Sequence, residues 1–273
     1  MKFGYINIGR GFTRKAAVIE NTLIRNKYDV LGVSEIDLDR FSSPPTMEGF
    51  TSVVKRDSNG LARICMYIRS SVPFDVTHIE GNYPGICIQL SQCTLVAVYN
   101  EFTDNAYNIN SRKIGEKERC NRVIEFLDQV AFRAKKNICI LGDCNIDWFS
   151  NTISKKRLSV WLTDHDCAQL IKSATRSTSN TCLDLVMCRL PNHSCKADVF
   201  DPAISDHHGI SISFGRSRED HAKVEYMKWN FTPEVRDYAR KCKINIDKLY
   251  HHLTTNEIAS EIVNWLSTIN DMS

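Results

Sequence analysis

Hydrophobic and polar positions alternate over short runs in the first 215 or so residues, and longer amphipathic runs separate these stretches. "KFGYINI" (2–8) alternates as a strand does, and "YDVLGVSE" (28–35) is a second, more fully apolar strand. Apolar residues recur at near-helical spacing over 13–27 and again over 114–135. The later helix leads into "NICILGDCNID" (137–147), an apolar strand that stops in a polar turn. This alternation predicts an α/β domain.

Two close pairs of apolar runs predict antiparallel hairpins. The runs at 50–56 and 62–70 flank "DSNG", whose Asn-Gly step suits a tight hairpin turn. The runs at 85–91 and 94–100 form another such pair. Because the remaining strands are separated by helices, the sheets are expected to be mixed rather than purely parallel.

Further strands are predicted at 182–190 and 208–214, so strands are many and helices few. This count favours a four-layer α/β sandwich, in which two mixed β-sheets pack face to face and helices cover the outside. We expect this domain to span residues 1–215. The composition turns polar at "GRSREDHAKVE", and we expect 216–273 to be a linker and a partly helical tail.

Composition and charge fit an ordinary globular protein. The chain of 273 residues is 42% hydrophobic and 25% charged, with a net charge of +3, which permits a polyanionic partner without requiring one. The 11 cysteines are irregularly spaced and contain no C-x-x-C pair, so we expect buried thiols in a reducing compartment. No signal peptide and no apolar run of about 18 residues is seen, so the cytosol or nucleus is expected, with no membrane partner.

Polar residues follow or precede several of the predicted strands. Each has an ordinary explanation as a turn or capping residue when it is taken alone. In layered β structures, however, strand ends from distant parts of the chain meet at one crevice. A cluster of acidic, amide and imidazole groups is therefore expected there, drawn from Asn7, Glu35, Asp143, Asn145, Asp184, Asp206 and His207.

Several of these motifs together resemble a known group of enzymes. "ILGDCNID" (140–147), "CLDLVM" (182–187) and "SDHHGI" (205–210), with Asn7 and Glu35, resemble the endonuclease/exonuclease/phosphatase superfamily, whose members have a DNase-I-like fold. The resemblance covers about residues 1 to 215. Within the superfamily, the motifs are most similar to the endonuclease domain of non-LTR retrotransposons. The tail resembles the segment that joins such a domain to a reverse transcriptase, which would be the covalently linked partner in a parent protein.

The resemblance implies a division of roles among these residues. Glu35 and Asn7 would hold Mg²⁺, with Mn²⁺ as the other possibility, and Asp206 would lie close to the metal. Asp143 would orient or deprotonate the attacking water, and Asn145 would donate to a phosphate oxygen. His207 would contact the scissile phosphate while Asp184 binds its other nitrogen, and Tyr99 is a further candidate at the phosphate. His208 is expected to pack or cap rather than to act in catalysis.

Basic residues near the predicted site are candidates for neutralising DNA phosphates. Arg176 and Thr175 match the family's "TR" motif and precede the short loop "STSN", and Arg10 follows the first strand. Further basic residues are expected in loops or helix starts near the site, at Arg14, Lys15, Arg112 and Lys113.

Two positions depart from the family pattern. Gly9 stands where the family commonly has a polar residue two positions after the asparagine, so a second metal ligand is lost there. Tyr99 is followed by "NEFTDN" instead of a proline-containing turn.

The motifs together predict a metal-dependent DNA endonuclease that nicks double-stranded DNA and leaves a 3′-hydroxyl to prime reverse transcription in the nucleus. A cellular apurinic-site repair endonuclease would use the same groups. A phosphatase for phosphoinositides or other small phosphoesters shares the catalytic core, and an inactive relative retained for binding is the non-enzymatic alternative.

Overall fold

The computed structural model of the protein describes residues 1–79, 85–102, 113–134, 137–190 and 193–216. The predicted linker and helical tail lie outside the described residues from 217 onward. None of the helices in the described part of the chain is long and apolar enough to cross a membrane. Among the described residues the ten cysteines form no disulfide bond, and most of them are buried, as the sequence predicts.

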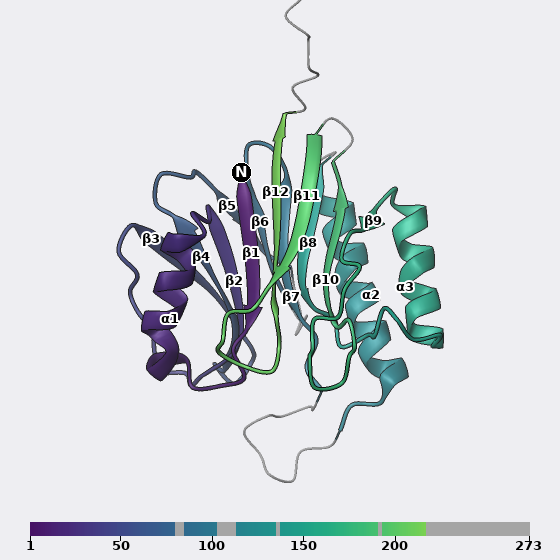
Figure 1. The fold of residues 1–273 in the computed structure, drawn as a ribbon, viewed down its shortest axis with the longest axis horizontal. Coiled ribbons are helices and arrows are strands. Elements are labelled where there is room, and N and C mark those ends of the chain that lie inside the picture. Colours follow the sequence, from purple (N-terminus) through teal and green to yellow (C-terminus); the bar gives the residue numbers. More distant parts are fainter. Residues whose placement is uncertain (80–84, 103–112, 135–136, 191–192, 217–273) are drawn as a thin grey trace, which may run out of the picture. The chain divides into compact units, whose positions relative to one another are not determined.

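The described strands form two six-stranded mixed sheets (Figure 1). In the first sheet β1 pairs parallel with β2, and the other pairings are antiparallel. Its strands, in spatial order, are β11 (His193–Phe200), β12 (Gly209–Arg216), β1 (Lys2–Asn7), β2 (Val30–Leu38), β4 (Ala62–Arg69) and β3 (Phe50–Arg56). The predicted hairpin around "DSNG" is the antiparallel pair β3–β4.

In the second sheet β7 pairs parallel with β8, and the remaining pairings are again antiparallel. Its strands, in spatial order, are β5 (Asp75–Thr77), β6 (Gly85–Gln89), β7 (Thr94–Tyr99), β8 (Ile138–Asp143), β10 (Asp184–Arg189) and β9 (Ala168–Gln169). The sequence pattern did not predict β11 or the short strands β5 and β9. Strand β9, with two residues, is too short for any periodicity to show.

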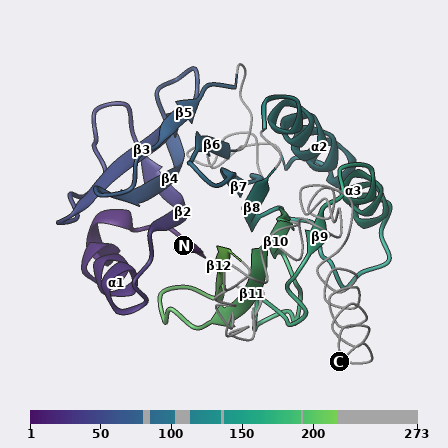
Figure 2. The ribbon, with the colours of Figure 1, turned by 90° about the horizontal axis from the view of Figure 1, so that it is seen from above.

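Helices cover both outer faces, so the expected four-layer sandwich is confirmed (Figure 2). α1 (Phe12–Arg25) packs on the first sheet, and α2 (Glu116–Arg133) lies with α3 (Ile153–Asp164) on the second. The sequence pattern did not predict α3, whose buried face is narrow. Its N-cap Thr152 accepts a hydrogen bond from the backbone N–H of Lys155, a capping signal that was present in the sequence.

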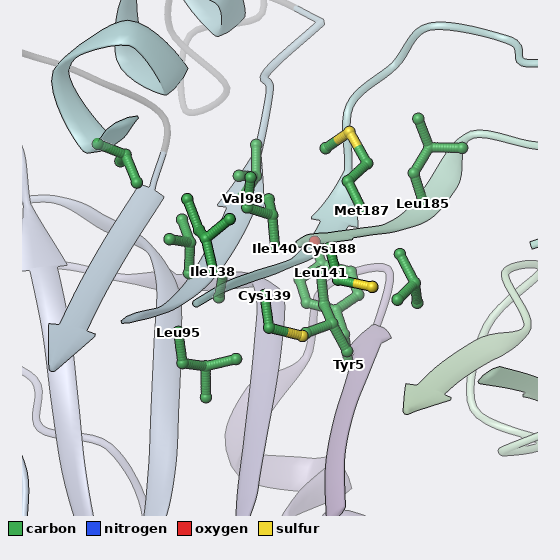
Figure 3. Close-up of a cluster of buried hydrophobic side chains, with 14 of the residues drawn as sticks. Tyr5, Leu95, Val98, Ile138, Cys139, Ile140, Leu141, Leu185, Met187 and Cys188 are labelled. Carbon is green, nitrogen blue, oxygen red and sulfur yellow. The ribbon is translucent and has the colours of Figure 1, made fainter. Parts of the chain in front are cut away.

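The main core includes the side chains between the two sheets. Tyr5 of β1 lies beside Leu141 and Cys139 of β8, whereas Leu185 and Met187 of β10 lie on the opposite face of the second sheet (Figure 3). A smaller cluster lies under α1 and includes Ile19 and Leu23. Burying these faces fixes the registers of the strands, since a slip of one residue would turn every apolar side chain outward. The registers in turn fix which polar residues meet at the ends of the strands.

Candidate active site

One edge of the sandwich brings together strand ends from both sheets. β1, β2, β7 and β8 reach this edge with their carboxyl ends, and the antiparallel strands β10 and β12 begin there. In the second sheet, Tyr99, Asp143 and Asp184 are paired directly in register on three neighbouring strands. Directly paired residues share a face of the sheet, so these side chains form one row. The predicted cluster at the strand ends therefore forms around this row.

A bulge in β2 sets the direction of Glu35. The register between β2 and β4 shifts between Ser34 and Leu38, and within this stretch Glu35 and Asp37 have φ angles of 56° and 47°. Side chains other than glycine adopt this left-handed conformation only at a cost. Bulges redirect side chains and are frequent beside active sites. Here the bulge brings Glu35, which is half-buried, into contact with residues of β1 and β7.

Asn7 connects the two sheets at this edge. Its amide nitrogen Nδ2 donates to Glu35 Oε1 and to Asp143 Oδ2, each at 3.0 Å. Its Oδ1 accepts a hydrogen bond from the backbone N–H of Gly9 at 3.0 Å. Gly9 has a φ of 56°, and a Cβ there would lie 3.3 Å from the Cβ of Ser205. The glycine that departs from the family pattern therefore suits a tight, left-handed turn after β1.

The end of β8 places Asp143 deep in the site. Asp143 is 1% exposed, and its Oδ1 accepts a hydrogen bond from the backbone N–H of Asn145 at 2.9 Å. The preceding residue is Gly142, where a Cβ would lie 1.9 Å from the carbonyl oxygen of Val98. Only glycine permits this close approach of β7 and β8. With its other oxygen bound by Asn7, the Asp143 carboxylate has a fixed orientation.

Asn100, which the sequence analysis did not single out, holds the turn after β8. Its backbone N–H donates to the carbonyl of Asp143 at 2.9 Å, and its Nδ2 donates to the carbonyl of Cys144 at 3.0 Å. Its own carbonyl accepts from Asn145 Nδ2 at 2.6 Å. Asn145 therefore uses one amide hydrogen for the turn, and its second hydrogen remains for another acceptor.

His207 and Asp184 form a buried pair. Asp184 Oδ2 lies 2.9 Å from His207 Nδ1, and the two residues are 0% and 7% exposed. The loop before β12 is held by Ser205, whose Oγ donates to the carbonyl of Asn7 at 2.5 Å and accepts from the backbone N–H of His207 at 3.2 Å. Since Nδ1 binds Asp184, the ring nitrogen Nε2 is the one left for a substrate. It has no hydrogen-bond partner among the described residues.

Burial and mutual charge shift the proton affinities of this group. Burial and the nearby Asp184 carboxylate raise the pKa of Asp143 to about 7, although His207 and hydrogen bonds oppose the rise. Burial disfavours the charged form of His207, but the hydrogen bond to Asp184 and the charges of Asp184 and Asp143 raise its pKa to about 9. At neutral pH the imidazole is a cation, while Asp143 lies close to its own midpoint.

Tyr99 is 5% exposed, and its hydroxyl is engaged on two sides. The hydroxyl accepts from Arg63 Nη2 at 3.0 Å and donates to Glu35 Oε1 at 3.3 Å. Burial raises the pKa of Tyr99 well above its ordinary value, and the charge of Arg63 only partly opposes this rise. The tyrosine is therefore a neutral hydrogen-bonding group next to Glu35, in contact with the site that the sequence predicts.

The residues assigned to DNA differ in exposure. The Arg176 side chain is 40% exposed, and its Nε donates to Asp206 Oδ2 at 2.7 Å. Burial tends to raise the pKa of Asp206, but the hydrogen bond and charge of Arg176 lower it overall. Asp206 thus pairs with Arg176 rather than with the Glu35–Asn7 pair to which the sequence assigns it. Arg10 is 65% exposed and lies 3.4 Å from Asp37, whereas Arg112 lies outside the described residues.

Thr175 has a structural position instead of a surface one. It is 0% exposed, and its Oγ1 accepts hydrogen bonds from the backbone N–H groups of Leu183 and Asp184, both at 3.0 Å. Its backbone carbonyl accepts from the N–H of His208 at 2.7 Å. Thr175 therefore joins the loop of Arg176 to the start of β10, and it holds Asp184 in place rather than facing DNA.

The donor set fits a divalent cation that prefers oxygen ligands. Asp143, Asp184 and His207 offer atoms within 4.8 Å of one another, but Nδ1 of the protonated imidazole is already bound to Asp184. Glu35 and Asp143 offer carboxylate oxygens, which Mg²⁺ and Mn²⁺ favour, whereas Asn7 turns its amide nitrogen to both carboxylates and its Oδ1 to the backbone N–H of Gly9. No partner of Glu35 Oε2 is found among the described residues, and the buried Asp184 Oδ1 is also without one. A cation beside Glu35 would balance this excess of acidic groups.

Several residues that shape the site were not predicted from the sequence, chiefly Arg63, Asn100 and Ser205. A signal existed for Arg63, because an arginine beside the apolar run "ICMYI" is rare inside a buried strand. No comparable signal existed for Asn100 or Ser205. Their roles depend on backbone groups that the tertiary structure brings to them.

Comparisons with known proteins bear on the fold. No protein-family model matches the chain, and no curated protein matches its sequence. Among solved structures, the endonuclease domain of TRAS1, a telomere-specific non-LTR retrotransposon, is similar with a TM-score of 0.58 and 16% identity. That match covers 79% of this chain and 97% of the other.

Two further solved structures are similar over nearly their whole length. The 3′-5′ exonuclease NExo from Neisseria meningitidis has a TM-score of 0.57 and 16% identity, covering 78% of this chain and 99% of that one. An AP endonuclease from Archaeoglobus fulgidus has a TM-score of 0.54 and 13% identity, with coverages of 78% and 99%. These neighbours belong to the endonuclease/exonuclease/phosphatase superfamily, so the expected DNase-I-like fold is confirmed.

Proposed function

We propose that this protein is a metal-dependent DNA endonuclease that nicks one strand of a duplex and leaves a 3′-hydroxyl. The observation that carries the proposal is one connected network at the edge of the sandwich. Asn7 joins the Glu35 and Asp143 carboxylates, and the Asp184–His207 pair lies beside Asp143. A fold alone does not define a function, so the proposal depends on this set of groups and its geometry.

Phosphodiester hydrolysis needs an activated water, charge stabilisation on the phosphate oxygens and help for the departing alkoxide, which takes up a proton to become the 3′-hydroxyl. Glu35, beside Asn7, would hold Mg²⁺ or Mn²⁺, and the bound cation would neutralise phosphate charge and make a water more acidic. Asp143 accepts the proton of the attacking water, a role that suits a carboxylate with a pKa of about 7. Its fixed carboxylate needs no reorientation for this transfer.

His207 stabilises the negative charge of the phosphate. The pKa of about 9 keeps the imidazole protonated at neutral pH, and Nε2 donates to a non-bridging oxygen. Asp184 keeps the ring oriented through Nδ1. Asn145 supplies its remaining amide hydrogen to another phosphate oxygen, and Tyr99 donates its hydrogen toward Glu35.

DNA is the substrate class that we favour. The similar solved structures are described as a retrotransposon endonuclease domain, an AP endonuclease and a 3′ phosphatase bound to a DNA hairpin. Arg176 and Arg10 are exposed near the site and would neutralise phosphates of a bound duplex. With the motif resemblance, this supports a nuclear role in which the nick primes reverse transcription by a covalently linked reverse transcriptase.

Apurinic-site repair is the second candidate, since an AP endonuclease is among the similar structures. The two functions use the same network and differ in the DNA that they prefer. A strong preference for an abasic duplex over an intact one would favour repair. Equal cleavage of both would favour the retrotransposon role.

The test is nicking of supercoiled plasmid by the purified protein with Mg²⁺, with Mn²⁺ and with EDTA. We expect metal-dependent nicks that a DNA polymerase extends, which reports the 3′-hydroxyl. Asp143→Asn should lower the rate by about 10²- to 10⁴-fold, the range for a lost general base. Asp75→Asn makes the same change at an exposed residue of β5 and should leave the rate unchanged. Absence of nicking with either metal, or equal rates for wild type and Asp143→Asn, would contradict the proposal.

A further inference from the structure

Arg63 is a nearly buried arginine that has no role in the proposed hydrolysis steps. It lies in β4 between Ala62, which pairs with Leu38, and Ile64, which pairs with Ser34. It therefore faces the bulge of β2 that redirects Glu35. Its side chain is only 12% exposed. An arginine so deeply placed needs several partners, because an unpaired buried charge is strongly destabilising.

The guanidinium of Arg63 contacts three residues, one in β2 and two in or directly after β7. Nη1 forms an ion pair with Asp37 in β2, and Nε lies 3.6 Å from Glu101, which follows β7. Nη2 donates to the Tyr99 hydroxyl at 3.0 Å, and the guanidinium carbon lies 5.3 Å from the centre of the Tyr99 ring. Burial disfavours the charge of Arg63, but Tyr99, Glu101 and Glu35 raise its pKa overall, so it remains a cation.

These contacts determine the direction of one hydrogen. A guanidinium has donors only, so the hydrogen bond between Arg63 and Tyr99 must use a lone pair of the phenol oxygen. The phenol hydrogen is then left for the other neighbour, Glu35 Oε1, at 3.3 Å. Glu35 Oε1 also accepts from Asn7 Nδ2, so this oxygen receives two donors. The other oxygen, Oε2, has no partner among the described residues.

We propose that Arg63 is a positioning residue of this site, which acts through the Tyr99 hydroxyl to orient the Glu35 carboxylate so that Oε2 faces a bound divalent cation. Arg63 does not touch the cation or the substrate. Asp37 and Glu101 hold the guanidinium from the other side, so that it cannot turn away from Tyr99. This inference rests on the proposed function only in taking Glu35 as a cation ligand.

The experiment is a double-mutant cycle on Mn²⁺ binding, measured without DNA by the electron paramagnetic resonance signal of free Mn²⁺. Arg63→Lys keeps a positive charge but loses the planar fork, and Tyr99→Phe keeps the ring but loses the hydroxyl. We expect each variant to weaken Mn²⁺ binding about 10-fold, the lower range for groups that orient a metal ligand. The double variant should bind no more weakly than the weaker single variant, because both act along one path.

Arg56→Lys is the matched control. The Arg56 guanidinium donates to the backbone carbonyls of Asp39, Ser42 and Gly60, and it has no contact with Tyr99 or Glu35. Its Mn²⁺ affinity should equal that of the wild type. If replacing a partly buried arginine weakened Mn²⁺ binding only by disturbing the fold, Arg56→Lys would weaken it too. The losses of Arg63→Lys and Tyr99→Phe would then multiply in the double variant.

The outcomes separate this inference from the proposed function. Multiplying losses in the double variant, wild-type affinity in Tyr99→Phe, or no Mn²⁺ binding by the wild type would each overturn the role of Arg63. If Arg63→Lys fails to fold, the affinity of Tyr99→Phe alone decides the question. If the losses of Mn²⁺ affinity are coupled but the protein nicks no DNA, the positioning role of Arg63 is supported and the endonuclease function is rejected. If the protein nicks DNA but the losses of the two variants are not coupled, the endonuclease function is supported and the role of Arg63 is rejected.

Discussion

The site has two halves that handle charge differently. The Asp143 half consists of Asp143, Asp184 and His207, all of them buried, and its charged groups are two carboxylates and one imidazole. The Glu35 half consists of Glu35, Asp37, Arg63, Tyr99 and Glu101, where a guanidinium stands among three carboxylates. Asn7 joins the halves by donating to Glu35 and Asp143.

The difference follows from the groups that balance the acids. In the Asp143 half the balancing cation is an imidazole, which has a pKa of about 9 and loses its proton at alkaline pH. In the Glu35 half it is an arginine, which stays charged at any ordinary pH. Buried titratable groups suit proton transfer, whereas a permanent cation suits the fixed orientation of a metal ligand. The same edge of the sandwich thus provides proton chemistry and cation binding side by side.

The largest expected effect is a loss of plasmid nicking that added Mg²⁺ restores in a variant of the Glu35 half but not in a variant of the Asp143 half. Glu35→Gln and His207→Gln should each slow plasmid nicking by roughly 100-fold, the order found when one group that stabilises the transition state is removed. Raising Mg²⁺ should recover most of the activity of Glu35→Gln, since that variant has lost a ligand charge. It should leave His207→Gln slow, because this residue acts on the phosphate. Rescue of both variants, or of neither, would break the distinction between the halves.

A smaller effect concerns the stability of the metal-free protein. The pKa of His207 rises from 6.5 to about 9 on folding, so its stabilisation is complete below pH 6.5 and is lost as the pH rises through about 9. A shift of this size corresponds to roughly 3 kcal/mol. Folding also raises the pKa of Asp143, to about 7. This destabilises the folded state at pH values above the pKa of the unfolded chain, so stability again falls as the pH rises. Both groups therefore make the protein more stable as the pH falls from 9 to 6.5.

Urea unfolding in EDTA at pH 6.5 and pH 9 measures this change. Asp184→Asn should reduce the pH dependence, because Asp184 raises the pKa of both His207 and Asp143. Arg63→Lys lies in the other half and should keep the dependence of the wild type. A protein that gains stability from pH 6.5 to pH 9 would contradict the protonated state assigned to His207.

The smallest effect is expected outside both halves, at Arg176. Its exposed guanidinium pairs with Asp206, and a phosphate would compete with that carboxylate. Arg176→Ala should weaken duplex binding only several-fold and reduce the salt dependence of log K by about one unit of slope. Fluorescence anisotropy at several salt concentrations measures both quantities. Lys172→Ala, at another exposed basic position, is the control, and an equal loss there would mean that Arg176 has no special contact.

The polarity of the chain predicted the strands that form the site. β1, β2, β7, β8, β10 and β12 all carry apolar runs in the sequence, and, with the exception of Asp206, the predicted polar residues that end or precede them meet at the site. The apolar pattern gives the strands and their inward faces directly, because one register buries the alternating side chains. α3 and β11 were not predicted because their hydrophobic patterns are weak. Neither element contributes a residue to the central network.

The sequence by itself determined the two-sheet sandwich and the set of acidic, amide and imidazole groups at its edge. It could not determine which group contacts which, and two assignments show why. Asp206 neighbours His207 in the chain but pairs with Arg176, and Thr175 neighbours Arg176 but binds the backbone of Asp184. Only the tertiary structure decided these partners, together with the path from Arg63 through Tyr99 to Glu35. Hydrogen bonds are short and directional, so they depend on the register of the two sheets and on the bulge in β2, which no local pattern of residues encodes.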